Sequence, residues 1–124
     1  MVSLRGLTVQ MDIKTLGEHL VGITFIGRLD TQGVDGVETR LTAAIVPEGN
    51  SAIVDLTHVE FIASMGIRML LSLARSLKMR HARVAIYGAA TQVSEVFETV
   101  ALQQLIPICT TEAEALAAVT APLA

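Results

Sequence analysis

Apolar and polar residues alternate at the start of the chain. Across residues 7–13, LTVQMDI, every second side chain is apolar, which is the pattern of a β-strand with one buried face. The segment TLGEH supplies a turn, and residues 20–27, LVGITFIG, form a second run rich in β-branched residues. Two such runs joined by a short turn predict a β-hairpin.

Three later segments repeat apolar residues every three or four positions, which indicates amphipathic helices. Asp30 or Thr31 can cap the first helix, and Pro47 ends it. The second helix is predicted over residues 67–80 and the third over residues 91–100. Each helix carries its own predicted buried stripe: Val34, Val37, Leu41 and Ile45 in the first, Leu70, Leu73, Ala74 and Leu77 in the second, and Val93, Val96, Phe97 and Val100 in the third.

Short apolar runs bounded by turn residues lie between these helices. Residues 52–56, AIVDL, and residues 83–88, RVAIYG, have the character of central strands covered on both faces. Residues 105–110, LIPICT, predict a short edge strand, because Pro107 cannot donate to a central hydrogen-bond ladder.

A last helix is predicted over residues 111–119, where Thr111 and Glu114 have the spacing of a capping box. The predicted order is therefore ββαβαβαβα. This alternation indicates an α/β fold: a mixed, largely parallel sheet with helices packed on it, formed as a single domain by residues 1–124.

Composition narrows the class of protein. Hydrophobic residues make up 52% of the 124 residues but aromatic residues only 3%, so the core is predicted to be aliphatic. A net charge of −3 argues against nucleic-acid binding. No segment has the length of a signal peptide or a membrane span, and the single Cys109, an apolar filler in this interpretation, cannot form an internal disulfide, so a cytoplasmic location is expected. His19, His58 and His81 lack metal-ligand spacing, and neither a metal nor a cofactor is expected.

The segment FIASMG at residues 61–66 carries the candidate chemistry. Ser64 is expected where a strand-end loop meets the first turn of a helix, so that its hydroxyl can act as the N-cap. The same position suits a phosphate, since free amides and the positive end of the helix dipole favour an anion there, and Gly66 allows close approach of the backbone. From the residues alone, both interpretations remain open.

Three segments resemble the STAS domain family, typified by bacterial anti-sigma-factor antagonists: GRLD at residues 27–30, AIVDLTHVEFIASMGIRMLLSLARSLK and CTTEAEALAAV. The resemblance implies that Ser64 is the phosphoacceptor of a switch that is not an enzyme. In that family the unmodified protein binds an anti-sigma factor that is also a serine kinase, phosphorylation ends the association, and a PP2C-type phosphatase resets it. The family usually has Asp immediately before the serine, where this chain has Ala63, so slower modification of Ser64 is expected.

The resemblance also implies a partner-binding surface on this loop and the helix that follows it. Its predicted members are Asp30, Ala63, Ser64, Met65, Gly66, Arg68 and Met69. Apolar surface around Met65 would suit a homodimer. The alternative is a non-catalytic STAS scaffold subunit of a signalling assembly or of a lipid or anion transporter, in which Ser64 only caps its helix.

Other candidate residues have competing interpretations. Asp30 is expected first as a helix cap, and both Asp30 and Asp55 are expected near the Ser64 loop. A hydrolase built on Ser64, His58 and Asp55 is disfavoured, because no G-x-S-x-G elbow surrounds the serine. A basic run is expected to be a solvated helix face rather than a site for an acidic partner or a nucleotide phosphate, and it comprises Arg68, Arg75, Lys78, Arg80 and Arg83.

Overall fold

A computed structural model describes residues 9–120. The elements follow the predicted order with one added 3-10 turn: β1 (Val9–Gly17), β2 (Leu20–Leu29), α1 (Thr31–Ile45), β3 (Ser51–Ile62), α2 (Ser64–Lys78), β4 (Val84–Tyr87), α3 (Thr91–Thr99), η1 (Leu102–Gln104), β5 (Ile108–Cys109) and α4 (Glu112–Thr120). The predicted strand position Leu7 lies outside the described residues.

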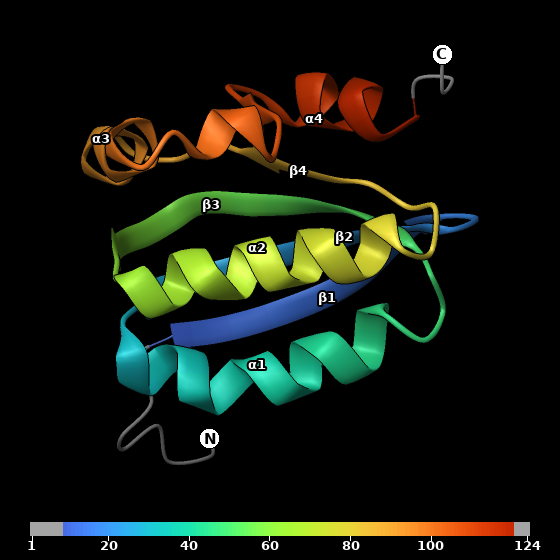
Figure 1. The fold of residues 1–124 in the computed structure, drawn as a ribbon, viewed down its shortest axis with the longest axis horizontal. Helices are drawn as coiled ribbons and strands as arrows, with labels where there is room; N and C mark the ends of the chain where they lie inside the picture. The colour runs from blue at the N-terminus through green and yellow to red at the C-terminus, as the bar shows by residue number, and fades with distance from the viewer. Residues whose placement is uncertain (1–8, 121–124) are drawn as a thin grey trace.

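The five strands form one sheet in the order β1-β2-β3-β4-β5. The predicted hairpin is confirmed, since β1 and β2 are antiparallel, and the remaining neighbours β2–β3, β3–β4 and β4–β5 are parallel. Helices α1 and α2 pack side by side on one face, and α4 packs on β3 and β4 (Figure 1). The mixed, largely parallel sheet predicted from the sequence is therefore confirmed.

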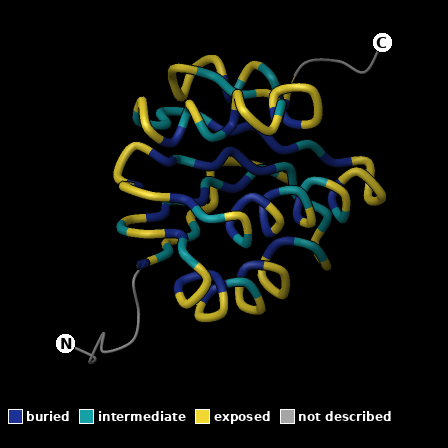
Figure 2. The backbone as a smooth tube through the Cα atoms, turned by 60° about the vertical axis from the view of Figure 1, so that its left-hand side comes forward, coloured by how far each residue is buried: buried dark blue, intermediate teal, exposed yellow. Residues whose placement is uncertain are grey.

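The core is mostly aliphatic, as predicted, with Phe25 and Phe97 as its two fully buried aromatic side chains. It lies on both faces of the central strands, where residues are buried in long runs (Figure 2). One cluster joins the stripes of α1 and α2 to β2 and β3, and a smaller cluster holds Ile53, Ala85, Ala115 and Val119 beneath α4. Alternate residues of β3 and β4 enter the two clusters, as expected for strands covered on both sides.

The predicted helix stripes are confirmed, with one error at the end of α3. Val100 is 49% exposed, because α3 ends at Thr99 and Val100 is the residue that follows its last turn. Ala74 and Val96 are only half-buried. The capping box is confirmed at α4: the Glu114 amide donates to Thr111 Oγ1 at 3.2 Å, and Glu114 Oε1 accepts from the Thr111 amide at 3.1 Å.

Strand β3 is longer than the five residues predicted, and it continues through residues 57–62. The polar residues THVE hid this extension, because Thr57, His58 and Glu60 face solvent while Val59 and Ile62 still enter the core. The register between β2 and β3 shifts twice along this stretch. Such irregularities re-aim side chains without ending the strand.

Candidate functional site

The candidate site lies at the edge of the sheet where β2 and β3 both end. Leu29 and Ile62 are register partners in these parallel strands. The next amide, that of Ala63, donates to the Leu29 carbonyl at 2.9 Å. Helix α1 begins just after β2 and helix α2 just after β3, so two helix N-termini lie at the same edge (Figure 1).

Ser64 is exposed and is the first residue of α2, so the prediction that it caps the helix is wrong. The cap position belongs to Ala63, whose backbone is extended (φ −95°, ψ 171°) and whose carbonyl accepts from the amides of Gly66 and Ile67. Alanine offers no side-chain acceptor, and the first turn of α2 holds no acidic residue. The positive end of α2 therefore lacks the side-chain cap that helix N-termini usually have.

Asp30 behaves as predicted at the neighbouring helix. It is the N-cap of α1, and its Oδ1 accepts from the Gly33 amide at 2.8 Å. Arg28 approaches the other carboxylate oxygen at 3.7 Å, and the Arg28 guanidinium stacks 4.4 Å from the centre of the Phe61 ring. The two helix starts thus differ. The N-cap side chain of α1 is a carboxylate that accepts a hydrogen bond, whereas the N-cap side chain of α2 is a methyl group that cannot.

Gly66 permits the close contact between α2 and the end of β2. A methyl group placed on it would lie 2.7 Å from Ile62 Cγ1 and 2.9 Å from the Leu29 carbonyl oxygen. Both are closer than real Cβ contacts, and one of the atoms belongs to the backbone. The role of Gly66 is therefore packing, and its burial removes it from the predicted contact surface.

The two methionines of the predicted surface separate. Met69 is 1% exposed and lies in the core, so its assignment to the partner surface is wrong. Met65 is half-buried and packs against the core with part of its side chain accessible, while Arg68 is exposed. The accessible part of the predicted surface therefore comprises Asp30, Ala63, Ser64, Met65 and Arg68.

Asp55 does not lie near Ser64, which corrects the prediction. It sits in the middle of β3 opposite Thr24 and Tyr87, and the seven residues to Ile62 span about 20 Å of extended strand. Its Oδ1 accepts from the Thr57 amide at 2.9 Å. This separation also argues against a hydrolase built on Ser64, His58 and Asp55.

Asp55 instead belongs to a cluster that sequence reasoning missed. Burial, followed by the negative charges of Asp55 and Glu112, raises the pKa of Tyr87 to about 12. The three residues come from β3, β4 and α4, so no local motif could have revealed them. Between residues 9 and 120, no group of three acidic, histidine or cysteine residues is arranged to hold a metal ion.

The predicted basic run is not a single surface. Arg80 donates to the Pro47 carbonyl at 2.7 Å, and Arg83 donates to the Ala118 carbonyl at 3.3 Å. Arg68 lies in the second turn of α2, whereas Lys78 is the last residue of that helix. Ten residues of helix separate them by about 15 Å.

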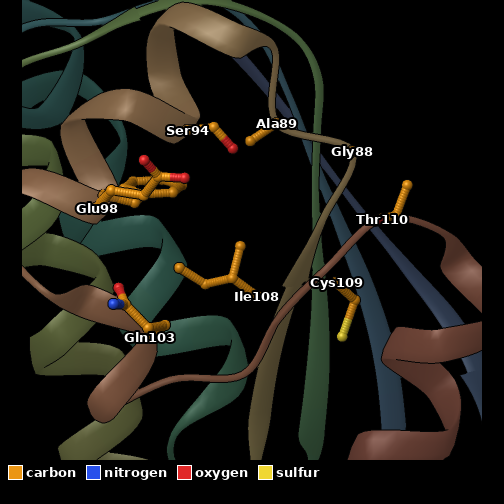
Figure 3. Close-up of a pocket in the computed structure, with 9 residues that line it drawn as sticks. Gly88, Ala89, Ser94, Glu98, Gln103, Ile108, Cys109 and Thr110 are labelled. Atoms are coloured by element: carbon orange, nitrogen blue, oxygen red, sulfur yellow. The ribbon is translucent and has the colours of Figure 1, made fainter.

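A concavity of about 490 Å³ lies apart from Ser64, where β4 and β5 end. In Figure 3, Ser94 and Glu98 of α3 point into it above Ile108. Cys109 directs its sulfur away from that group, and it packs against the smaller core cluster beneath α4. Burial, with a smaller effect of Glu114, raises the pKa of the Cys109 thiol, as suits an apolar filler.

Among the described helices, none combines the length and the apolar character needed to cross a membrane. The chain is similar in sequence and in fold to several known proteins. The anti-sigma-B factor antagonist of Listeria monocytogenes is 25% identical over 108 residues, which is 87% of this chain and 95% of the relative.

Solved structures also share the fold, and two of them illustrate the likeness. The anti-sigma factor antagonist SpoIIAA in its unphosphorylated form has a TM-score of 0.76 at 21% identity, covering 93% of this chain and all of SpoIIAA. An anti-sigma factor antagonist from Mycobacterium paratuberculosis has a TM-score of 0.79 at 19% identity, covering 90% of this chain and 93% of that one. The STAS domain model matches residues 10–115, and the chain therefore belongs to the STAS domain family.

Proposed function

We propose that the chain is an anti-sigma-factor antagonist, a binding module that sequesters an anti-sigma factor with serine kinase activity. Family membership and the Listeria relative support this proposal. The proposal of a phosphorylation switch rests on the position of Ser64. Its exposed hydroxyl lies on the first residue of a helix whose N-terminus has no side-chain cap. Phosphorylation of this hydroxyl by the bound kinase ends the association.

The geometry tolerates a phosphate on Ser64. A phosphate at a helix N-terminus accepts hydrogen bonds from free amides and lies at the positive end of the dipole. It adds about −1.5 to −2 charges. Arg68 lies four residues further along α2, so the two exposed side chains are neighbours on the helix surface. The fold therefore accepts this charge. A partner docked over the loop would instead bind more weakly, because the phosphate would have to be desolvated in the interface.

The partner surface consists of the accessible residues around the two helix starts. Ser64 and Arg68 lie on α2, Asp30 lies at the start of α1, and Met65 adds apolar area beside them. We further infer that a PP2C-type phosphatase resets the switch. A second copy of the chain would compete with the anti-sigma factor for the apolar area of Met65.

Binding of charge variants tests the proposal. Purified Ser64→Ala and Ser64→Asp variants are titrated against the kinase-type anti-sigma factor of the same organism, without ATP. Ser64→Ala is expected to bind within about threefold of the parent, whereas Ser64→Asp is expected to lose about tenfold or more, because its carboxylate is desolvated in the interface.

Ser72→Asp is the matched control, since Ser72 is also an exposed serine of α2 but lies two turns from the helix start. It adds the same charge and is expected to bind like the parent. Equal binding by the Ser64→Ala and Ser64→Asp variants contradicts the switch and favours a constitutive scaffold role.

A further inference from the structure

A cavity of about 600 Å³ lies at the end of the sheet opposite Ser64. It forms where the last turns of α2, the segment that leads into β4, the segment before β5 and the second half of α4 meet. The residues that line it are Ala74, Lys78, His81, Ala82, Arg83, Val84, Leu105, Pro107 and Ala118. Its volume falls in the range of small-molecule sites, about 300–1,000 Å³.

The charge of this cavity is one-sided. Two permanent cations, Lys78 and Arg83, line it together with His81, and no carboxylate from residues 9–120 lines it. This contrasts with the chain as a whole, which carries a net charge of −3. The cavity thus concentrates positive charge on a mildly acidic protein, and this charge would attract an anion bound there.

The helix dipoles reduce this positive charge but do not cancel it. Helix α2 ends at Lys78, and α4 ends at Thr120 beside the cavity. Each helix C-terminus is equivalent to about −0.5 charge, so two termini offset about one of the two cations. About one positive charge of the two therefore remains for a ligand. The dipole effect also fades within one turn of the helix end, so it weakens further away from the two termini.

Arg83 is held in place for such a contact. Its backbone amide donates to Ser51 Oγ at 3.0 Å, and its Nη1 donates to the Ala118 carbonyl at 3.3 Å. A guanidinium has five N–H donors, so this bond to Ala118 leaves others that can reach an anion. A half-buried, anchored arginine loses little conformational freedom when it binds a carboxylate or phosphate.

The rest of the lining is apolar. Ala74, Ala82, Val84 and Pro107 form the wall, and Leu105 stands beside them with 66% of its surface exposed. We propose that this cavity binds a small amphiphilic anion, a carboxylate or phosphate carried on an aliphatic chain, with the anionic group on Lys78 and Arg83 and the chain along Leu105 and Pro107. This site is separate from the Ser64 surface and does not depend on the proposed switch.

Titration of the isotope-labelled chain with sodium decanoate, followed by amide chemical shifts, tests the proposal. The amides of Ala82, Val84 and Leu105 are expected to shift and saturate below the micellar concentration of decanoate. Acetate, which lacks the chain, and decyltrimethylammonium, which carries the opposite charge, are expected to leave them unshifted. Sedimentation with phosphatidylglycerol vesicles separates the two sources of the ligand: co-sedimentation identifies a membrane lipid, and its absence identifies a free amphiphile.

Lys78→Gln is expected to weaken decanoate binding about tenfold, the loss of one charge-assisted contact. Arg75→Gln is the matched control, because Arg75 is an exposed cation in the last turn of the same helix that does not line the cavity. It should change binding by less than about twofold. Shifts that map elsewhere, equal binding of the decyl cation, or equal effects of the two substitutions would each overturn the proposal.

Discussion

At the scale of single residues, Gly66 sets the position of the site. Its missing side chain lets the first turn of α2 lie against Ile62 and the Leu29 carbonyl, which fixes Ser64 beside the start of α1. A sequence motif can suggest that this glycine frees the backbone for a phosphate. The distances show a packing requirement that holds whether or not the serine is modified.

Gly66→Ala is therefore expected to lower the free energy of unfolding by about 1–3 kcal/mol, the usual cost of forcing extra atoms into a packed contact. Urea denaturation measures this change. Gly17→Ala is the control, since a methyl group at Gly17 meets nothing within 4 Å and is expected to change stability by less than about 0.5 kcal/mol. A neutral Gly66→Ala substitution would show that α2 can move away from β2 at no cost.

Burial at neighbouring residues shows why the site was only partly predictable. The sequence correctly predicts Ser64 at the strand–helix junction but wrongly predicts it as the N-cap. The helix begins one residue earlier than that prediction requires, so that Ala63 is the cap and Ser64 is the first helical residue. Met65 and Met69 are four residues apart and both fit an apolar stripe. The depth to which each is buried depends on how α2 rolls on the sheet, and sequence spacing does not contain that angle.

At the scale of elements, the start of α2 is the unusual feature. The extended backbone of Ala63 suits an N-cap residue, yet its side chain cannot accept a hydrogen bond. Ala63→Asp is expected to raise the free energy of unfolding by about 1 kcal/mol, because Asp would accept from a first-turn amide. Urea denaturation measures this, and Ala63→Asn separates the hydrogen bond from the charge.

The same pair of variants tests the kinase reaction. With ATP and the cognate kinase, mass spectrometry is expected to find phosphate on Ser64 of the parent chain, and faster labelling in Ala63→Asp than in Ala63→Asn. Labelling of another residue with Ser64 untouched would contradict the proposed phosphoacceptor.

Strands were harder to predict than helices. The stripes of α1 and α2 are long and periodic, so spacing predicted all four buried stripe positions of α1 and, in α2, Leu70, Leu73 and Leu77, although it missed the burial of Met69. Strand β3 was predicted to stop at Leu56, because the next residues are polar and the period-two pattern is interrupted by a shift in register with β2. In a strand of residues 52–56, Asp55 would lie one residue from the carboxyl end, and it was therefore expected near the Ser64 loop. The length of β3 depends on its pairing with β2, which continues to Ile62 and which the local sequence does not reveal.

At the scale of the whole molecule, the fold separates its chemistry along the sheet. The proposed partner surface around Ser64 lies where β2 and β3 end, and the cationic cavity lies at the opposite end beside β4 and α4. Between them, Tyr87 joins β4 to Asp55 of β3 and Glu112 of α4. This cluster therefore links β3, β4 and α4 through side-chain electrostatics.

The raised pKa of Tyr87 makes the stability of the fold dependent on pH. Its folded value of about 12 exceeds its ordinary value of 10.0, so the folded chain holds the phenolic proton more tightly than the unfolded chain does. The resulting stabilisation is fully present below pH 10 and is lost as the pH rises toward 12. The free energy of unfolding is therefore expected to fall over this window relative to Tyr87→Phe. Because the chain has one tyrosine and no tryptophan, tyrosinate absorbance reports the midpoint directly, and a midpoint near 10 in the folded chain would contradict the coupling.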